Sequence, residues 1–194
     1  MSTKKYELSE NSKTNAFGRK VFQIRALQDI ARFGIKKGDL GGWVQSELNL
    51  SQDGNAWVSG NARVSGNARV SGDAWVSGNA RVYDNAWVSG NARVEEFENL
   101  FLASPIANDY FITLHRTEKG HRINIGCWSG TIDELLPKVR ERRLTEQQVA
   151  EYEALVPLLQ KRIDSWKPAE PVKTERELKI EQLEKELEAL KASE

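Results

Sequence analysis

The chain has 194 residues, and its 28 lysines and arginines are balanced by 28 aspartates and glutamates. A formal net charge of zero disfavours a protein that binds nucleic acid by neutralising many phosphates, although it allows a local basic patch. No apolar run is long enough to span a membrane, and the N-terminus lacks the apolar stretch of a signal peptide. With one cysteine and no such signal, we expect a protein of a reducing cytoplasm, without membrane attachment.

Residues 1–40 are predicted to form a β-rich N-terminal cap. Phe22, Ile24 and Ala26 alternate with residues that include Gln23, a pattern typical of a strand or hairpin. The stack of strands predicted for the next region would expose unpaired backbone groups at its open end. A cap is needed to cover them.

Seven consecutive units of six residues run from Asn55 to Glu96, and they read NAWVSG, NARVSG, NARVSG, DAWVSG, NARVYD, NAWVSG and NARVEE. Each Ala-x-Val is predicted to be a short strand whose two ends point inward while its middle residue points outward. Ser-Gly-Asn then suits a tight corner, because Gly and Asn tolerate positive φ. Three such sides would close a triangular coil of 18 residues, and successive coils would stack as parallel strands. With one imperfect coil before it, the repeat defines a β-helix over residues 41–96.

The imperfect coil is the stretch Gly38–Gly54, GDLGGWVQSELNLSQDG. Trp43 lies 14 residues before Trp57, where two regular hexads would give 12. We therefore expect a two-residue loop to bulge out between Glu47 and Gln52.

The region 97–166 is expected to combine a hairpin with helices. Alternation predicts strands at residues 110–116 and 121–127 around a four-residue turn. This register places Leu114 opposite Ile123, and it builds one apolar face.

Two helices are predicted after the hairpin. Thr131 and Thr145 each begin a Thr-x-x-Glu/Gln capping box, which is typical of a helix N-terminus. One apolar stripe follows at spacings of three and four, made by Val149, Tyr152, Val156, Leu159, Ile163 and Trp166.

The segment 167–194 is interpreted as a linker, marked by Pro168 and Pro171, and a short coiled-coil helix. Its a and d positions are Ile180, Leu183, Leu187 and Leu190. Two heptads are too short to hold chains together alone, so we expect the segment to reinforce an oligomer or to dock on a partner. A solvated helix is the alternative.

The outward residue of every hexad is Trp or Arg. Residues 18 apart are expected to stack in three columns: Trp57, Trp75 and Arg93; Arg63 and Arg81; Arg69 and Trp87. These residue types are enriched in interface hot spots, and exposed tryptophans are otherwise costly. We therefore predict that at least one face binds a protein, either another subunit or a target. The alternative is that the columns only stabilise the stacking.

The arginine column has a further property. Arg63 and Arg81 would place like charges one strand spacing apart, which is unfavourable unless the side chains splay or an anion bridges them.

The spacing of Val58 to Ala62 resembles the motif of the hexapeptide-repeat proteins, which implies a left-handed parallel β-helix. A right-handed triangular β-helix is the alternative. The blocks FQIRALQDI, GDLGGWV and INIGCWSGTIDEL are similar to the flanks of a group of bacteriophage and prophage proteins. This resemblance, over residues 6 to 136, implies a phage-encoded protein that acts on a host system in the bacterial cytoplasm. The hexapeptide resemblance also implies a trimer.

We expect no enzymatic activity, no cofactor and no metal site. Hexapeptide acyltransferases resemble this chain in fold and use a histidine as general base, but the hexads contain none. His115 and His121 are expected to lie on different faces of the hairpin, and zinc would need more ligands than these two. Cys127 is expected to be a small buried hydrophobe.

The sequence therefore predicts a non-catalytic homo-oligomer, with a trimer favoured, that grips a host protein as an inhibitor or adaptor, for instance in defence. Three alternatives stay open: an acyltransferase-like enzyme with an intersubunit site, a nucleotide-binding sponge, and a purely structural self-assembling module. In the sponge, arginines would hold phosphates and tryptophans would stack on bases.

Overall fold

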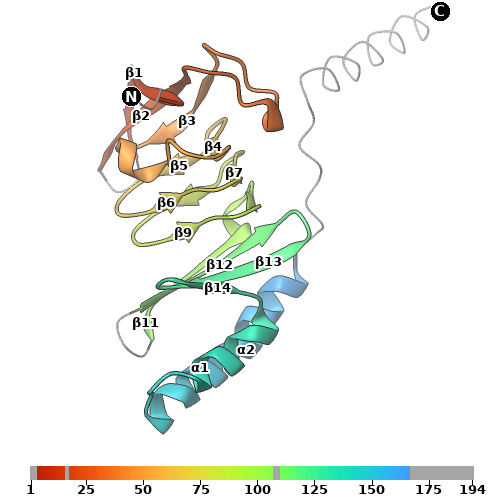
Figure 1. The fold of residues 1–194 in the computed structure, drawn as a ribbon. Helices are drawn as coiled ribbons and strands as arrows, with labels where there is room; N and C mark the ends of the chain where they lie inside the picture. The colour runs from red at the N-terminus through yellow and green to blue at the C-terminus, as the bar shows by residue number, and fades with distance from the viewer. Residues whose placement is uncertain (1–3, 16–17, 107–109, 167–194) are drawn as a thin grey trace, which may run out of the picture.

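A computed structural model describes residues 4–15, 18–106 and 110–166. The predicted coiled-coil positions Ile180, Leu183, Leu187 and Leu190 lie outside the described residues. A stack of short strands lies between an N-terminal group of strands and a C-terminal sheet, and two helices cover the far side of that sheet (Figure 1). None of the helices in the described ranges is both long and apolar enough to cross a membrane.

The N-terminal strands are β1 (Tyr6–Thr14), β2 (Lys20–Ala26) and β3 (Leu40–Val44). The solenoid strands are β4 (Trp57–Val58), β5 (Arg63–Val64), β6 (Arg69–Val70), β7 (Trp75–Val76), β8 (Arg81–Val82), β9 (Trp87–Val88) and β10 (Arg93–Val94). The C-terminal elements are β11 (Leu100–Ile106), β12 (Tyr110–Thr117), β13 (Gly120–Ile125), β14 (Trp128–Gly130), α1 (Ile132–Arg140) and α2 (Glu146–Asp164). Short 3₁₀ helices are η1 (Ala31–Phe33), η2 (Glu47–Asn49) and η3 (Phe97–Asn99).

The solenoid strands pair in parallel with residues 18 positions along the chain, as the hexads predict. Three sheets result, which we call walls: the first wall is β4–β7–β10, the second is β3–β5–β8 and the third is β6–β9. The Ala and Val of every hexad are buried and form the core between the walls. The stacking of the three predicted columns is therefore confirmed.

The imperfect first coil is confirmed as well. Trp43 pairs with Arg63, a spacing two residues longer than the regular 18. The two extra residues lie between Ser51 and Gly54, because Leu50 still pairs with Val70, 20 positions along the chain, whereas Asn55 contacts Asp73, 18 positions along. The loop therefore lies at the C-terminal end of the expected range and just beyond it. In the preceding η2 turn, the Asn49 amide donates to the carbonyls of Gly66 and Ala68 at 3.0 and 2.8 Å.

Side chains donate hydrogen bonds to backbone carbonyl oxygens at the N-terminal end of the solenoid. Lys5 is buried, and its ammonium donates to the carbonyl oxygen of Ala56 at 2.8 Å. The Tyr6 hydroxyl donates to the carbonyl of Leu50 at 2.7 Å. Burial lowers the pKa of Lys5 to about 8, although nearby carboxylates, chiefly that of Asp53, oppose the shift.

The C-terminal sheet, ordered β11–β12–β13–β14, closes the other end. Its hairpin has the predicted register, with Leu114 opposite Ile123. Because side chains alternate along a strand, Leu114 packs against the helices while Thr113 faces the last coil. The backbone N–H of Trp87 donates to the Thr113 hydroxyl at 3.1 Å, and the Asn124 amide donates to the Trp87 carbonyl at 2.6 Å.

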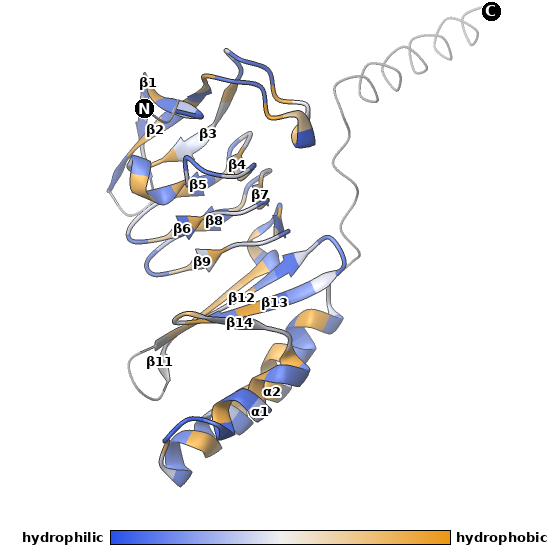
Figure 2. Ribbon diagram, viewed as in Figure 1, coloured by the Kyte–Doolittle hydropathy of each residue, from blue (hydrophilic) through white to orange (hydrophobic). Residues whose placement is uncertain are grey.

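Both predicted capping boxes begin helices. Thr131 starts α1 and Thr145 starts α2. The predicted apolar stripe on α2 packs into a second hydrophobic core, which lies between the two helices and the C-terminal sheet. Tyr152 and Leu159 of this stripe are fully buried. Both helices carry hydrophobic residues beside hydrophilic ones (Figure 2), as expected for helices that cover one face of a sheet.

Candidate functional site

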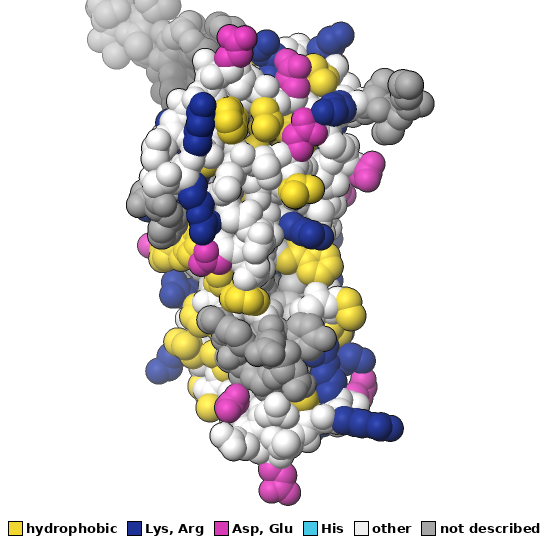
Figure 3. All heavy atoms as spheres, turned by 90° about the vertical axis from the view of Figure 1, so that its left-hand side faces the viewer, with side chains coloured by type: hydrophobic (Ala, Val, Ile, Leu, Met, Phe, Trp, Pro, Cys, Tyr) yellow, Lys and Arg dark blue, Asp and Glu magenta, His cyan; other side chains and the backbone are white. Residues whose placement is uncertain are grey.

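The candidate binding residues lie on the outer surfaces of the three walls. Seen from the left-hand side of Figure 1, Lys and Arg side chains interleave with hydrophobic ones over the stacked coils (Figure 3). The three walls differ in what covers them, so each is described in turn.

The first wall does not expose the column of Trp57, Trp75 and Arg93 as a binding face would require. Trp57 is fully buried, and Arg93 is only 2% exposed. Trp75 is partly buried beneath Phe33, whose ring centroid lies 4.7 Å from that of Trp75. The interpretation of Trp57 and Arg93 as exposed contact residues is therefore wrong. Hexad spacing shows which side chains point outward, but a distant segment of the same chain covers them.

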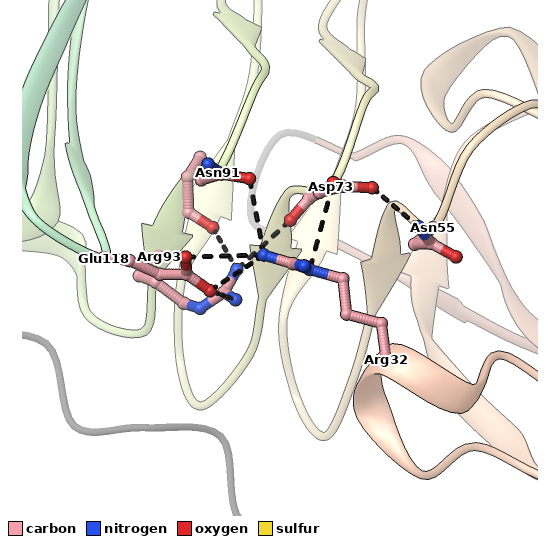
Figure 4. Close-up of polar contacts among 7 residues, drawn as sticks. Arg32, Asn55, Asp73, Asn91, Arg93 and Glu118 are labelled. Atoms are coloured by element: carbon pink, nitrogen blue, oxygen red, sulfur yellow. Dashed lines mark hydrogen bonds and ion pairs between the residues drawn. The ribbon is translucent and has the colours of Figure 1, made fainter.

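The segment that covers Trp75 and Arg93 is residues 30–35, which we call the clasp and which a bridge between Ile30 and Ile35 closes. From the clasp, Arg32 reaches between Asp73 and Glu118 (Figure 4), with nitrogen to oxygen distances of 3.9 and 3.1 Å. The clasp thus joins the N-terminal region to the C-terminal hairpin across the whole height of the solenoid.

Glu118 also pairs with the buried guanidinium of Arg93, which donates in addition to the carbonyls of Asp73 and Ala92. Burial lowers the pKa of Arg93, and the Glu118 charge opposes this shift. Sequence reasoning missed this network. Its one signal is Asp73, the only hexad start that is Asp rather than Asn.

The second wall carries a column of cations. The Lys13 ammonium lies 3.7 Å from the ring centroid of Trp43, a cation–π contact, and Arg63 and Arg81 follow in the same column. Burial and the charge of Arg63 together lower the pKa of Lys13. Within the described parts of the chain, neither Arg63 nor Arg81 has a carboxylate partner. Positive charge on this wall is therefore uncompensated.

The third wall carries a hollow of about 870 Å³, which we call the groove. It is lined by residues 46–52, by the outer surface of β6 and β9, and by Gly126. Arg69 and Trp87 lie side by side on adjacent strands at its base. Trp87 is 36% exposed, and its indole N–H donates to the Ser71 hydroxyl at 3.3 Å, which fixes the ring. Leu48 stands on the rim and is 82% exposed.

The two histidines lie apart, as predicted. His115 is fully buried between the C-terminal sheet and the last coil, whereas His121 Nε2 accepts the backbone N–H of Ile132 at 2.9 Å, at the start of α1. Across the described ranges, no group of three or more His, Cys, Asp or Glu is placed to hold a metal ion.

Cys127 is exposed, so its predicted burial beside Ile125 is wrong. β13 ends at Ile125, and Cys127 then follows Gly126 in the turn to β14, where strand alternation no longer applies. No catalytic arrangement was predicted around this thiol.

The comparison with known families agrees with the stacked coils. A family model described as the YdcK beta solenoid repeat matches residues 62–78 and again residues 74–90. The two matches start 12 residues apart, which is two hexads, and together they cover β5 to β9. No curated protein matches the chain. The central hexads are thus similar to the repeat of a β-solenoid, and the chain is mainly β with such a repeat at its centre.

Proposed function

We propose that this protein is a non-catalytic binding module that grips another protein through the groove of its third wall. The observation that carries the proposal is the pairing of Arg69 with Trp87 at the base of that hollow. Trp and Arg are the residue types most enriched among those that contribute most to protein interfaces. The exposed Leu48 on the rim adds apolar surface that a partner would cover.

The charge pattern supports an acidic partner. Arg63 and Arg81 on the second wall, like Arg69 on the third, have no carboxylate partner among the described residues. Carboxylates of another protein would relieve the repulsion between stacked guanidinium groups and would steer its approach. The second wall is therefore a second contact area for the same partner.

The resemblance to hexapeptide-repeat and phage proteins supports the finer parts of the proposal. The coil is triangular and left-handed, and the protein is a phage-encoded inhibitor or adaptor that acts on a host protein in the bacterial cytoplasm. It assembles as a homo-oligomer, with a trimer favoured. Light scattering at micromolar concentration tests the assembly, and a monomer would contradict it.

The groove is tested by affinity capture from bacterial lysate with quantitative mass spectrometry. A host protein should be retained by the wild type and lost with R69A/W87A. The matched control F97A/R140A removes an exposed aromatic residue and an exposed arginine outside the walls, and it should retain the partner. Equal retention by R69A/W87A, with its circular dichroism unchanged, would contradict the groove. A bound nucleotide released on denaturation would instead favour the sponge.

A further inference from the structure

One corner of the solenoid departs from the repeat. Five of the seven hexads end in Ser-Gly, but the fifth ends in Tyr83-Asp84. Most other residues that depart from the repeat sequence form hydrogen bonds or ion pairs with another side chain. Asp73 accepts from Asn55 and pairs with Arg32, and Glu95 pairs with Arg116. Among the described residues, the carboxylate of Asp84 has only a distant cation, Arg19, with 4.0 Å between nitrogen and oxygen.

The backbone at this corner would favour glycine. Asp84 has φ of 56°, and it is the only residue other than glycine with positive φ in the described part of the chain. The equivalent corner one coil earlier uses Gly66 at φ of 70°. An aspartate in this conformation is less favourable than glycine, and residues held in such conformations cluster at binding sites. Asp84 therefore holds a backbone conformation that glycine adopts at the equivalent corner of the preceding coil.

A cavity of about 680 Å³ lies at this corner, within the size range of small-molecule sites. Arg19, Asp84 and Phe111 are among the residues that line it. The Nη1 atom of Arg19 is buried and has no hydrogen-bond partner, which is a costly state for a charged donor. The lack of a side chain at Gly66 leaves room for the Arg19 guanidinium, because a Cβ there would lie 2.7 Å from Nη1 of Arg19. The Arg19 side chain as a whole is 39% exposed, so a ligand in the cavity would contact the outer part of this side chain and not Nη1.

The remaining lining groups define the ligand. Asn67 donates to the Asn85 side-chain oxygen at 3.1 Å, so the Asn67 oxygen and the Asn85 nitrogen stay available. Together with the Arg19 donor and the Asp84 acceptor, the cavity offers both kinds of hydrogen-bonding group within a short span. Tyr83 adds an aromatic ring to the lining, as Phe111 does.

We propose that this corner cavity binds a neutral saccharide. Hydroxyl groups both donate and accept, so a ring with several of them matches the mixed set of Arg19, Asp84, Asn67 and Asn85. The aromatic rings suit the apolar C–H face of such a ring. The charges of Arg19 and Asp84 cancel, which opposes an anion such as a phosphate as much as a cation. The cavity adjoins the third-wall groove, since Gly66, Asn67 and Asn85 line both, but Arg69 and Trp87 do not line the cavity. The saccharide proposal does not depend on the proposed function.

The test uses the repeat itself as a template. The variant Y83S/D84G restores the corner that the neighbouring hexads have, so it is expected to fold. Saturation-transfer NMR is recorded on the full chain with the methyl glycosides of glucose, galactose and mannose at millimolar concentration. Wild type should transfer saturation to the ring protons of at least one glycoside, and Y83S/D84G should weaken that binding by roughly tenfold or more. R69A/W87A should bind as the wild type does.

Three outcomes would overturn the proposal. One is the absence of transfer to all three glycosides, and another is unchanged binding by Y83S/D84G. The third is a site that takes inorganic phosphate, detected by chemical-shift changes at Arg19, in place of the glycosides. Thermal unfolding of Y83S/D84G at or above the wild-type temperature shows that any loss of binding is not a loss of fold.

Discussion

Asn124 lies between His115 and the last coil of the solenoid, with its Nδ2 atom 3.2 Å from His115 Nε2 and 2.6 Å from the Trp87 carbonyl oxygen. A carbonyl can only accept, so the amide nitrogen faces Trp87. Because that nitrogen can only donate, His115 Nε2 is the unprotonated ring nitrogen. Its Nδ1 then carries the proton and donates to the Arg116 carbonyl at 3.2 Å. The buried imidazole is therefore held in its neutral form.

This geometry predicts that acid destabilises the protein through His115. Burial lowers the pKa of His115 from 6.5 to about 4. Below pH 6.5 the unfolded chain gains a proton at this site that the native protein does not bind. The free energy of unfolding should therefore fall by roughly 3 kcal/mol between pH 6.5 and about 4.

Urea unfolding at pH 7, 5.5 and 4 measures this effect for wild type and H115Q. H115Q should lose less stability across the range, whatever its stability at pH 7. H121Q is the matched control, because burial lowers the pKa of His121 as well, but this imidazole is only partly buried. The same pH dependence in wild type and H115Q would show that another group is responsible.

The register of the solenoid could be predicted from the sequence because its signal is local and strictly periodic. The hexads fix which residues lie 18 apart, and Trp57, Trp75 and Arg93 stack accordingly. The hairpin register followed in the same way from alternation over a short turn.

The predictions from the sequence fail where segments that are far apart along the chain pack together. Trp57 is buried because the N-terminal region folds against it, and Ile24 and Gly41 lie there. In β2, burial does not follow the alternation of Phe22, Ile24 and Ala26: Phe22 is only partly buried and Val21 is fully buried, in strands whose pairing shifts at irregularities. The corner cavity also depends on such contacts, since Arg19 comes from a segment far from the hexads.

Two corner glycines should respond differently to the same change. Gly60 and Gly78 have nearly equal φ values, 60° and 57°, so G60A and G78A should share a backbone strain of about 1 kcal/mol. An added Cβ at Gly78 would lie 2.5 Å from the Glu95 carbonyl oxygen, whereas at Gly60 the nearest atom is 3.7 Å away. G78A should therefore cost about 1–3 kcal/mol more than G60A in urea unfolding. Equal losses would mean that the coils can separate at this corner.

The pair of Arg93 and Glu118 should matter more than the exposed ion pairs of the clasp. E118A leaves a buried guanidinium with only carbonyl partners, and we expect it to cost about 2–3 kcal/mol. R32A removes a half-exposed side chain and should cost about 0–1 kcal/mol. R93M/E118A should recover part of the loss, because it removes the unpaired charge. If R32A were the more damaging variant, the clasp and not the buried pair would hold the two ends together.

Trp57 and Trp87 should have opposite roles although they occupy the same hexad position. W57A removes a fully buried ring from the core of the solenoid, and we expect a loss of about 3–5 kcal/mol in the free energy of unfolding. W87A removes a ring that is 36% exposed, so its cost should be about 1–2 kcal/mol, while capture of a partner should be lost.

Chemical denaturation gives the stabilities of both variants, and the lysate capture gives binding at a temperature where each remains folded. W57F is the control for the core, because it keeps an aromatic ring inside and should retain more stability than W57A. The ranking follows from what covers each ring: the N-terminal region packs over Trp57, but the groove leaves Trp87 open. A W87A variant that binds its partner normally, or that unfolds as readily as W57A, would show that the third wall serves stability and not recognition.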